Sequence, residues 1–143
     1  MNNTSVLPEN ATTYQIENAF FSSISRGDVE GVNEMIKKLL KSDLVISKLS
    51  SDDTRPLKYW AINTIAIATR YAISGGADEK ACYAFTDDAI MQIDGLTAES
   101  DILQFLFKKS LQLVTLVNKI QSNTHPKAVR EALKIISSRL FDD

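Results

Sequence analysis

The residues that could carry out chemistry are few, and no sequence spacing pairs a nucleophile with a base. The chain has one histidine, His125, and one cysteine, Cys82. A serine or cysteine nucleophile needs a base within hydrogen-bond reach, and a thiolate zinc site needs several cysteines. Adjacent Asp87 and Asp88 diverge by about 100° on a helix, with no third carboxylate fixed nearby. We therefore predict that the chain is not an enzyme and binds neither a metal nor a cofactor.

Arg70 is the most informative charged residue, because it lies near the end of an otherwise apolar segment. An unpaired buried guanidinium is costly, so we expect an acidic partner, with Asp87 or Asp88 as candidates. A structural ion pair is favoured over contact with an anionic ligand. Trp60 and Tyr83 could line a small-molecule pocket beside Arg70, although packing in the core explains Trp60 at least as well.

Two further cations, Arg55 and Lys58, lie three residues apart on the first turn of a predicted helix. Such a pair could hold a phosphate or a carboxylate, but cations at a helix N-terminus oppose the helix dipole. A solvated helix face is therefore the favoured interpretation.

The elements that position these residues are predicted to be helices throughout. Apolar residues recur every three or four residues, as on one face of a helix, and no segment alternates between apolar and polar residues as a strand would. We predict an all-α bundle of six to seven helices, with a long apolar central helix and a long C-terminal helix. A hairpin turns at Arg26-Gly27-Asp28, and a helix capped by Asp53 or Thr54 runs to Gly75-Gly76, where glycine takes the left-handed conformation. A short pair, 78–85 and 86–93, should follow, with Thr86 capping the second member.

The rest of the chain is predicted to contain its longest helix, from Thr97 to about Ser122, and a further helix after Pro126. Leu106, Leu113 and Val117 lie on one stripe of the longest helix, whose apolar arc is wider than one packing face needs. We therefore predict that this stripe mediates self-association. The domain boundaries follow as a lead-in over 1–12, a helical domain over 13–122 and a connecting helix over 123–143.

Composition and charge indicate a cytoplasmic protein without a membrane segment. Of the 143 residues 44% are hydrophobic, and the formal net charge is −2. The N-terminus has neither a cationic lead nor an apolar run, which argues against a signal peptide. Residues 78–101 contain seven acidic side chains and one lysine, whereas 108–139 contain seven basic side chains and one glutamate. Complementarity within the fold or at a dimer interface explains this polarity better than DNA binding does.

One stretch resembles AraC-type transcriptional regulators of Gram-positive bacteria. It comprises Arg55-Pro56-Leu57-Lys58, then Ile62, Thr69-Arg70-Tyr71-Ala72 and Gly75-Gly76. Downstream, Tyr83, Thr86-Asp87-Asp88, Gln92-Ile93-Asp94 and His125-Pro126-Lys127-Ala128-Val129 fall in corresponding places, so that the resemblance covers roughly residues 15–140. Tyr59 and Ile65 stand where that family often has asparagine.

The resemblance implies a regulatory domain. In that family two helix-turn-helix units follow, and these 143 residues contain no counterpart of them. We therefore expect a non-catalytic ligand-sensing or dimerising domain, which does not itself read DNA sequence and whose last helix leads toward a DNA-binding region. The implied partners are a second copy, a full-length regulator or RNA polymerase. The alternative function is a helical adaptor that binds a protein in the groove beside Arg26-Gly27-Asp28.

Overall fold

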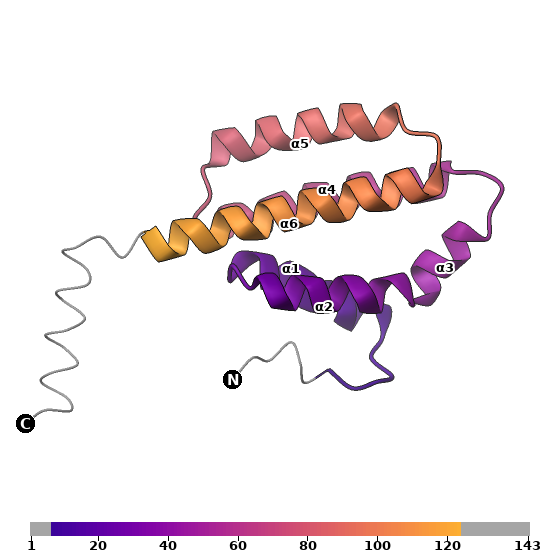
Figure 1. The fold of residues 1–143 in the computed structure, drawn as a ribbon, viewed down its shortest axis with the longest axis horizontal. Coiled ribbons are helices and arrows are strands. Elements are labelled where there is room, and N and C mark those ends of the chain that lie inside the picture. Colours follow the sequence, from indigo (N-terminus) through magenta and orange to yellow (C-terminus); the bar gives the residue numbers. More distant parts are fainter. Residues whose placement is uncertain (1–6, 124–143) are drawn as a thin grey trace, which may run out of the picture.

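The structure, a computed structural model, describes residues 7–123, and this part of the chain folds into six helices without a strand. The predicted all-α bundle is confirmed. In Figure 1, α4 and α6 lie one behind the other, with α5 on one side and the α1–α2 pair on the other. The helices are α1 (Thr13–Ser25), α2 (Val29–Leu40), α3 (Asp43–Leu49), α4 (Arg55–Ser74), α5 (Glu79–Asp94) and α6 (Glu99–Asn123).

The predicted hairpin joins α1 and α2. Thr12 and Gln15 form a reciprocal capping box at the start of α1, and the Asp28 carboxylate accepts a hydrogen bond from the Gly31 amide at the start of α2. Between them Gly27 has a φ of +66°, a conformation that side chains disfavour. The residues in and beside the turn are therefore enough to determine where the hairpin forms.

Helix α4 is the central element of the bundle, in contact with α1, α5 and α6. Its inward face carries Leu57 and Ile65 followed by the small residues Ala68 and Ala72, all fully buried. Small side chains allow neighbouring helices to approach closely. Tyr59 is 64% exposed on the opposite face, so this long helix is not apolar all round.

The predicted break at Thr86 is wrong, because α5 is one continuous helix. Asp78 caps it by accepting from the Ala81 amide, and Gly95 ends it. Thr86 points inward instead, and its buried hydroxyl donates to the Thr69 hydroxyl at 2.6 Å. Neither glycine nor proline occurs at the predicted boundary between residues 85 and 86, and a threonine whose hydroxyl is hydrogen-bonded does not interrupt a helix.

Helix α6 buries the stripe that we expected to mediate self-association. Leu106, Leu113 and Val117 are each at most 1% exposed, because α6 packs on α4, α2 and α1. These three side chains belong to the core of one chain, and their assignment to an interface between copies is wrong. The predicted connecting helix after Asn123 lies outside the described residues.

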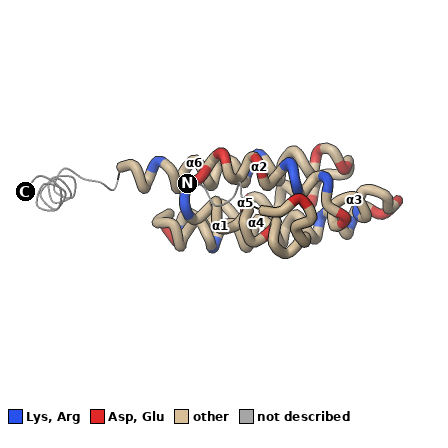
Figure 2. Tube along the Cα trace, turned by 90° about the horizontal axis from the view of Figure 1, so that it is seen from below, with Lys and Arg blue, Asp and Glu red and all other residues tan. Residues whose placement is uncertain are grey.

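Charged residues of both signs are interspersed along the bundle (Figure 2). The ion pairs of the described residues are all local: Arg26–Asp28, Glu34–Lys37 and Asp53–Arg55. None of them joins the acidic segment to the basic one. In the described part of the chain, no helix combines the length and apolar character that crossing a membrane requires.

Candidate functional site

The structure does not assemble the polar site predicted around Arg70. Arg70 is exposed, donates to the Ala66 carbonyl at 2.9 Å, and lies over the Tyr83 ring with 5.3 Å from its guanidinium carbon to the ring centroid. Asp87 and Asp88 are exposed on α5 and form no ion pair with it. The expected pairing is wrong because inward-pointing Thr86 turns both aspartates toward solvent.

Trp60 also lies apart from that site, in the core. It is 8% exposed, and its indole Nε1 donates to a Glu17 carboxylate oxygen at 3.1 Å, which ties α4 to α1. Ten residues separate it from Arg70, about 15 Å along the helix axis. Trp60, Tyr83 and Arg70 therefore do not line one pocket.

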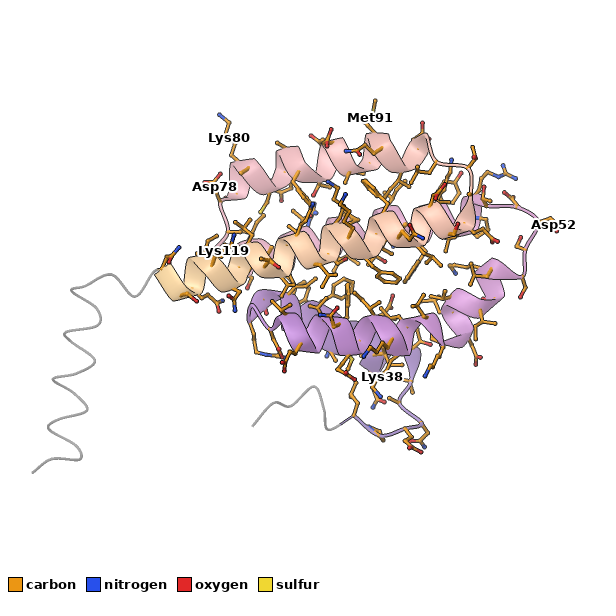
Figure 3. The ribbon with its side chains drawn as sticks, in the orientation of Figure 1. Lys38, Asp52, Asp78, Lys80, Met91 and Lys119 are labelled. Carbon is orange, nitrogen blue, oxygen red and sulfur yellow. The ribbon has the colours of Figure 1, made fainter. Side chains whose placement is uncertain are left out.

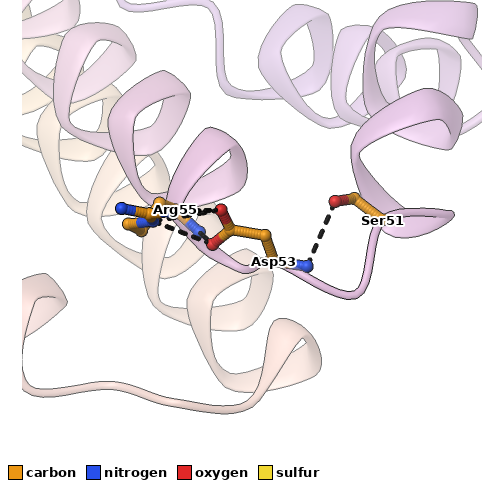
Figure 4. Close-up of polar contacts among 3 residues, drawn as sticks. All are labelled: Ser51, Asp53 and Arg55. Atoms are coloured by element: carbon orange, nitrogen blue, oxygen red, sulfur yellow. Dashed lines mark hydrogen bonds and ion pairs between the residues drawn. The ribbon is translucent and has the colours of Figure 1, made fainter.

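Arg55 and Lys58 stabilise helix ends. The Arg55 guanidinium makes a bidentate contact with Asp53, with Nη2 at 2.7 Å from Oδ2, and the Asp53 carboxylate also accepts from the Arg55 amide (Figure 4). These hydrogen bonds from Arg55 lower the pKa of Asp53 from 3.8 to about 2. Thr54 occupies the N-cap without a side-chain hydrogen bond, so Asp53 supplies the cap. Lys58 Nζ donates to the Asp94 carbonyl at the end of α5, at 2.9 Å.

The two glycines of the motif, Gly75 and Gly76, have different roles. Only Gly76 has a left-handed backbone, with a φ of +114°, whereas Gly75 has a φ of −81°. Gly75 instead allows a close approach, because a Cβ there would overlap the Ser25 carbonyl oxygen and lie 2.8 Å from Val117 Cγ1. The ends of α1 and α4 therefore meet α6 at this point.

Two amide side chains of α6 complete this meeting point. Gln121 Nε2 donates to the Ser25 carbonyl at 2.9 Å and to the Gly75 carbonyl at 3.1 Å. Asn118 Nδ2 donates to the Gly27 carbonyl at 3.1 Å. We call these five residues the helix-end junction, and α6 ends two residues beyond it. Sequence reasoning missed both amides, although amides three residues apart beside an apolar stripe are a usable signal.

A second feature, the α6 groove, runs along the outer face of the same helix. It has a volume of about 930 Å³ and lies at the solvent side of α6. Figure 3 marks Lys119, which lies near one end of it. The apolar lining is formed by Leu40, Leu103, Phe107, Leu111 and Leu116, and the polar lining by Ser100, Gln104, Lys108, Gln112, Thr115 and Lys119.

The α6 groove offers contacts by which another surface could bind. The groove combines an apolar floor with amide, hydroxyl and ammonium groups at its rim, which suits a helix or another amphipathic surface. Cys82 is buried, and burial raises the pKa of its thiol, so the thiolate is disfavoured. No group of three or more potential metal-ligating side chains occurs within residues 7–123.

These features define a class, the all-α helical bundle, with an exposed groove on its longest described helix. Comparison with protein-family models, with curated proteins and with solved structures yields no match.

Proposed function

We propose that this chain is a non-catalytic regulatory domain of an AraC-like transcription regulator and that it acts in the cytoplasm. The resemblance of its sequence to that family suggests this role. The observation that carries the proposal is the helix-end junction, which joins the ends of α1 and α4 to the last turns of α6. In the family that the chain resembles, the DNA-binding region lies C-terminal to the regulatory domain.

The junction supplies a route by which binding could change the direction in which the chain leaves α6. Gln121 contacts two backbone carbonyls that belong to different helix ends, so a displacement of either end changes its hydrogen bonds. Around Gly75 the backbone of α4 packs closely against the Ser25 carbonyl and Val117, so there is no free space in which a helix end could shift without moving its neighbours. A ligand or partner that binds one arrangement of the bundle more tightly would then shift the orientation of α6.

The α6 groove supplies the surface for such a partner. It also supports the alternative function, a helical adaptor, but at a different place from the one the sequence suggested. At the Arg26-Gly27-Asp28 turn, the Gly27 carbonyl is already bonded to Asn118, whereas the groove presents exposed apolar side chains.

The test replaces the chromosomal gene with variants and compares transcript profiles. Deletion is expected to change the transcripts of a defined set of promoters, and the wild-type gene is expected to restore them. Gln121→Ala should accumulate as a folded protein and fail to restore them, because α6 loses both carbonyl contacts. Gln92→Ala is the matched control, since Gln92 is an exposed amide on α5 that bonds only within its helix. An unchanged profile after deletion would overturn the proposal.

A further inference from the structure

The α6 groove carries two lysines that have no ion-pair partner in the described part of the chain. Lys108 and Lys119 are both exposed on its rim. The neighbouring Lys109 differs, because its Nζ lies 5.2 Å from the ring centroid of Phe85 and 5.3 Å from that of Phe105. Among the described residues that line the groove, none is acidic. The formal charge of the groove is therefore entirely positive.

The two lysines stand in one row beside an open apolar surface. They are eleven residues apart, which is about three helical turns and about 16.5 Å. Gln112 and Thr115 lie between them in this row. Leu40 and Leu116 are 40% and 42% exposed, so the apolar part of the groove is accessible. Along α6 the groove extends over 100–119, about 28 Å, which is the length of a medium-sized helix.

We propose that the α6 groove binds an amphipathic helix of another protein, one whose apolar face is bordered by acidic residues. This inference rests on the proposed function and names the chemistry of its protein partner. Carboxylates about three turns apart on the partner helix would meet Lys108 and Lys119, while its apolar side chains cover Leu111 and Leu116. Burial of the apolar side chains supplies most of the affinity, and the two ion pairs select the acidic partner and set its direction.

Two other occupants match the charges of the groove less well. A second copy of this chain would bring the same two lysines to the contact, and like charges across an interface are unfavourable. A nucleic-acid strand carries many phosphates over this length, whereas the groove offers two cations. Phe107, the aromatic residue of the lining, is buried and presents no exposed ring on which a base could stack.

The test measures the binding of three fluorescent probes to the full 143-residue chain by fluorescence anisotropy. The first probe is a designed helical peptide of about 18 residues, matched to the length of the groove, with one leucine face bordered by glutamates. The second peptide has lysines in place of the glutamates. The third probe is a single-stranded oligonucleotide with the net charge of the first peptide. We expect micromolar binding of the acidic peptide and at least about 10-fold weaker binding of the other two probes.

Charge reversal in the groove should exchange the preference between the two peptides. Lys108→Glu and Lys119→Glu should each weaken binding of the acidic peptide by about 10-fold, and the double variant should bind the basic peptide more tightly than the acidic one. Lys80→Glu is the matched control, because Lys80 is exposed on α5 and lies outside the groove (Figure 3). It should change neither affinity.

The apolar part of the groove is tested separately. Leu116→Ala should weaken binding of the acidic peptide by about 5-fold, because apolar surface is lost from the contact. Met91→Ala is the control, since Met91 is an exposed apolar side chain on α5, and it should have no effect. All the substituted side chains are exposed, so the circular dichroism of each variant should match that of the wild-type chain.

Three results would overturn the proposal. They are no binding of the acidic peptide up to about 1 mM, equal binding of the two peptides, and binding of the oligonucleotide at least as tight as that of the acidic peptide. A groove already covered by a second copy or by another segment of this chain would give the first result. The Gln121→Ala transcript test does not use this surface, so failure of the groove and failure of the regulatory role remain distinguishable.

Discussion

Replacing Gly75 by alanine should loosen the helix-end junction by adding a single methyl group. At a φ of −81° alanine is allowed, so the backbone itself is not strained. The new Cβ would nevertheless overlap the Ser25 carbonyl oxygen and lie 2.8 Å from Val117 Cγ1, where carbon atoms prefer about 3.5–4.0 Å. Helices α1 and α6 must therefore move away from α4 by about 1 Å.

The magnitude of the effect is the balance of two opposing contributions. Overpacking of a tight site costs about 1–3 kcal/mol, whereas replacing glycine by alanine in an allowed conformation gains about 0.4–1 kcal/mol through the unfolded state. A net loss of about 1–2 kcal/mol should lower the melting temperature by about 3–8 °C for a chain of this size.

Gly95→Ala is the matched control for this prediction. Gly95 also ends a helix, with a φ of −83°, but its Cβ would meet only the Gln92 carbonyl, at 3.6 Å, which is an ordinary contact. It should be neutral or stabilising by up to about 1 kcal/mol. Thermal unfolding followed by circular dichroism measures both variants. Equal melting temperatures for the two would refute the close packing at Gly75.

Three further predictions concern side chains of α4, α5 and the segment before α4. Thr69→Val should destabilise the chain by about 1–3 kcal/mol, because it leaves the buried Thr86 hydroxyl without its acceptor, and adding Thr86→Val should recover part of the loss in urea unfolding. The Asp53 carboxylate, with its pKa lowered from 3.8 to about 2, stabilises the folded chain above pH 3.8, and this contribution is lost as the pH falls through about 2. An NMR titration should place its midpoint near 2, and in Arg55→Ala the midpoint should return toward 3.8. Because burial raises the pKa of the Cys82 thiol, a thiol reagent at neutral pH should label it only as fast as the chain opens, and rapid labelling of the folded protein would contradict this.

Much of the fold could be predicted because its signals are local. The hairpin around Gly27, the cap at Asp28 and the stop at Gly75-Gly76 each depend on residues within one turn of each other. The error at Thr86 shows the limit of such signals. A threonine can cap a helix or lie inside one, and here the inward orientation depends on Thr69, which is seventeen residues away.

The candidate site was harder to predict, because it depends on which side of each helix faces the core. The apolar arc of α6 was visible in the sequence, but its division into a buried stripe and an exposed groove depends on how α1, α2 and α4 pack against it. Leu106 and Leu116 have the same side-chain chemistry, yet one is fully buried and the other is 42% exposed. Likewise, Gln121 has a role only because two helix ends converge on it.

The most direct test of the regulatory role is chromatin immunoprecipitation of the gene product, tagged at its chromosomal locus and expressed at its natural level. A regulator that acts through an attached DNA-binding region or through a partner regulator should be enriched at a small set of promoters. Those promoters should coincide with the transcripts that change on deletion. Promoter occupancy no higher than that of an untagged strain, under conditions in which deletion alters transcription, would contradict the regulatory role.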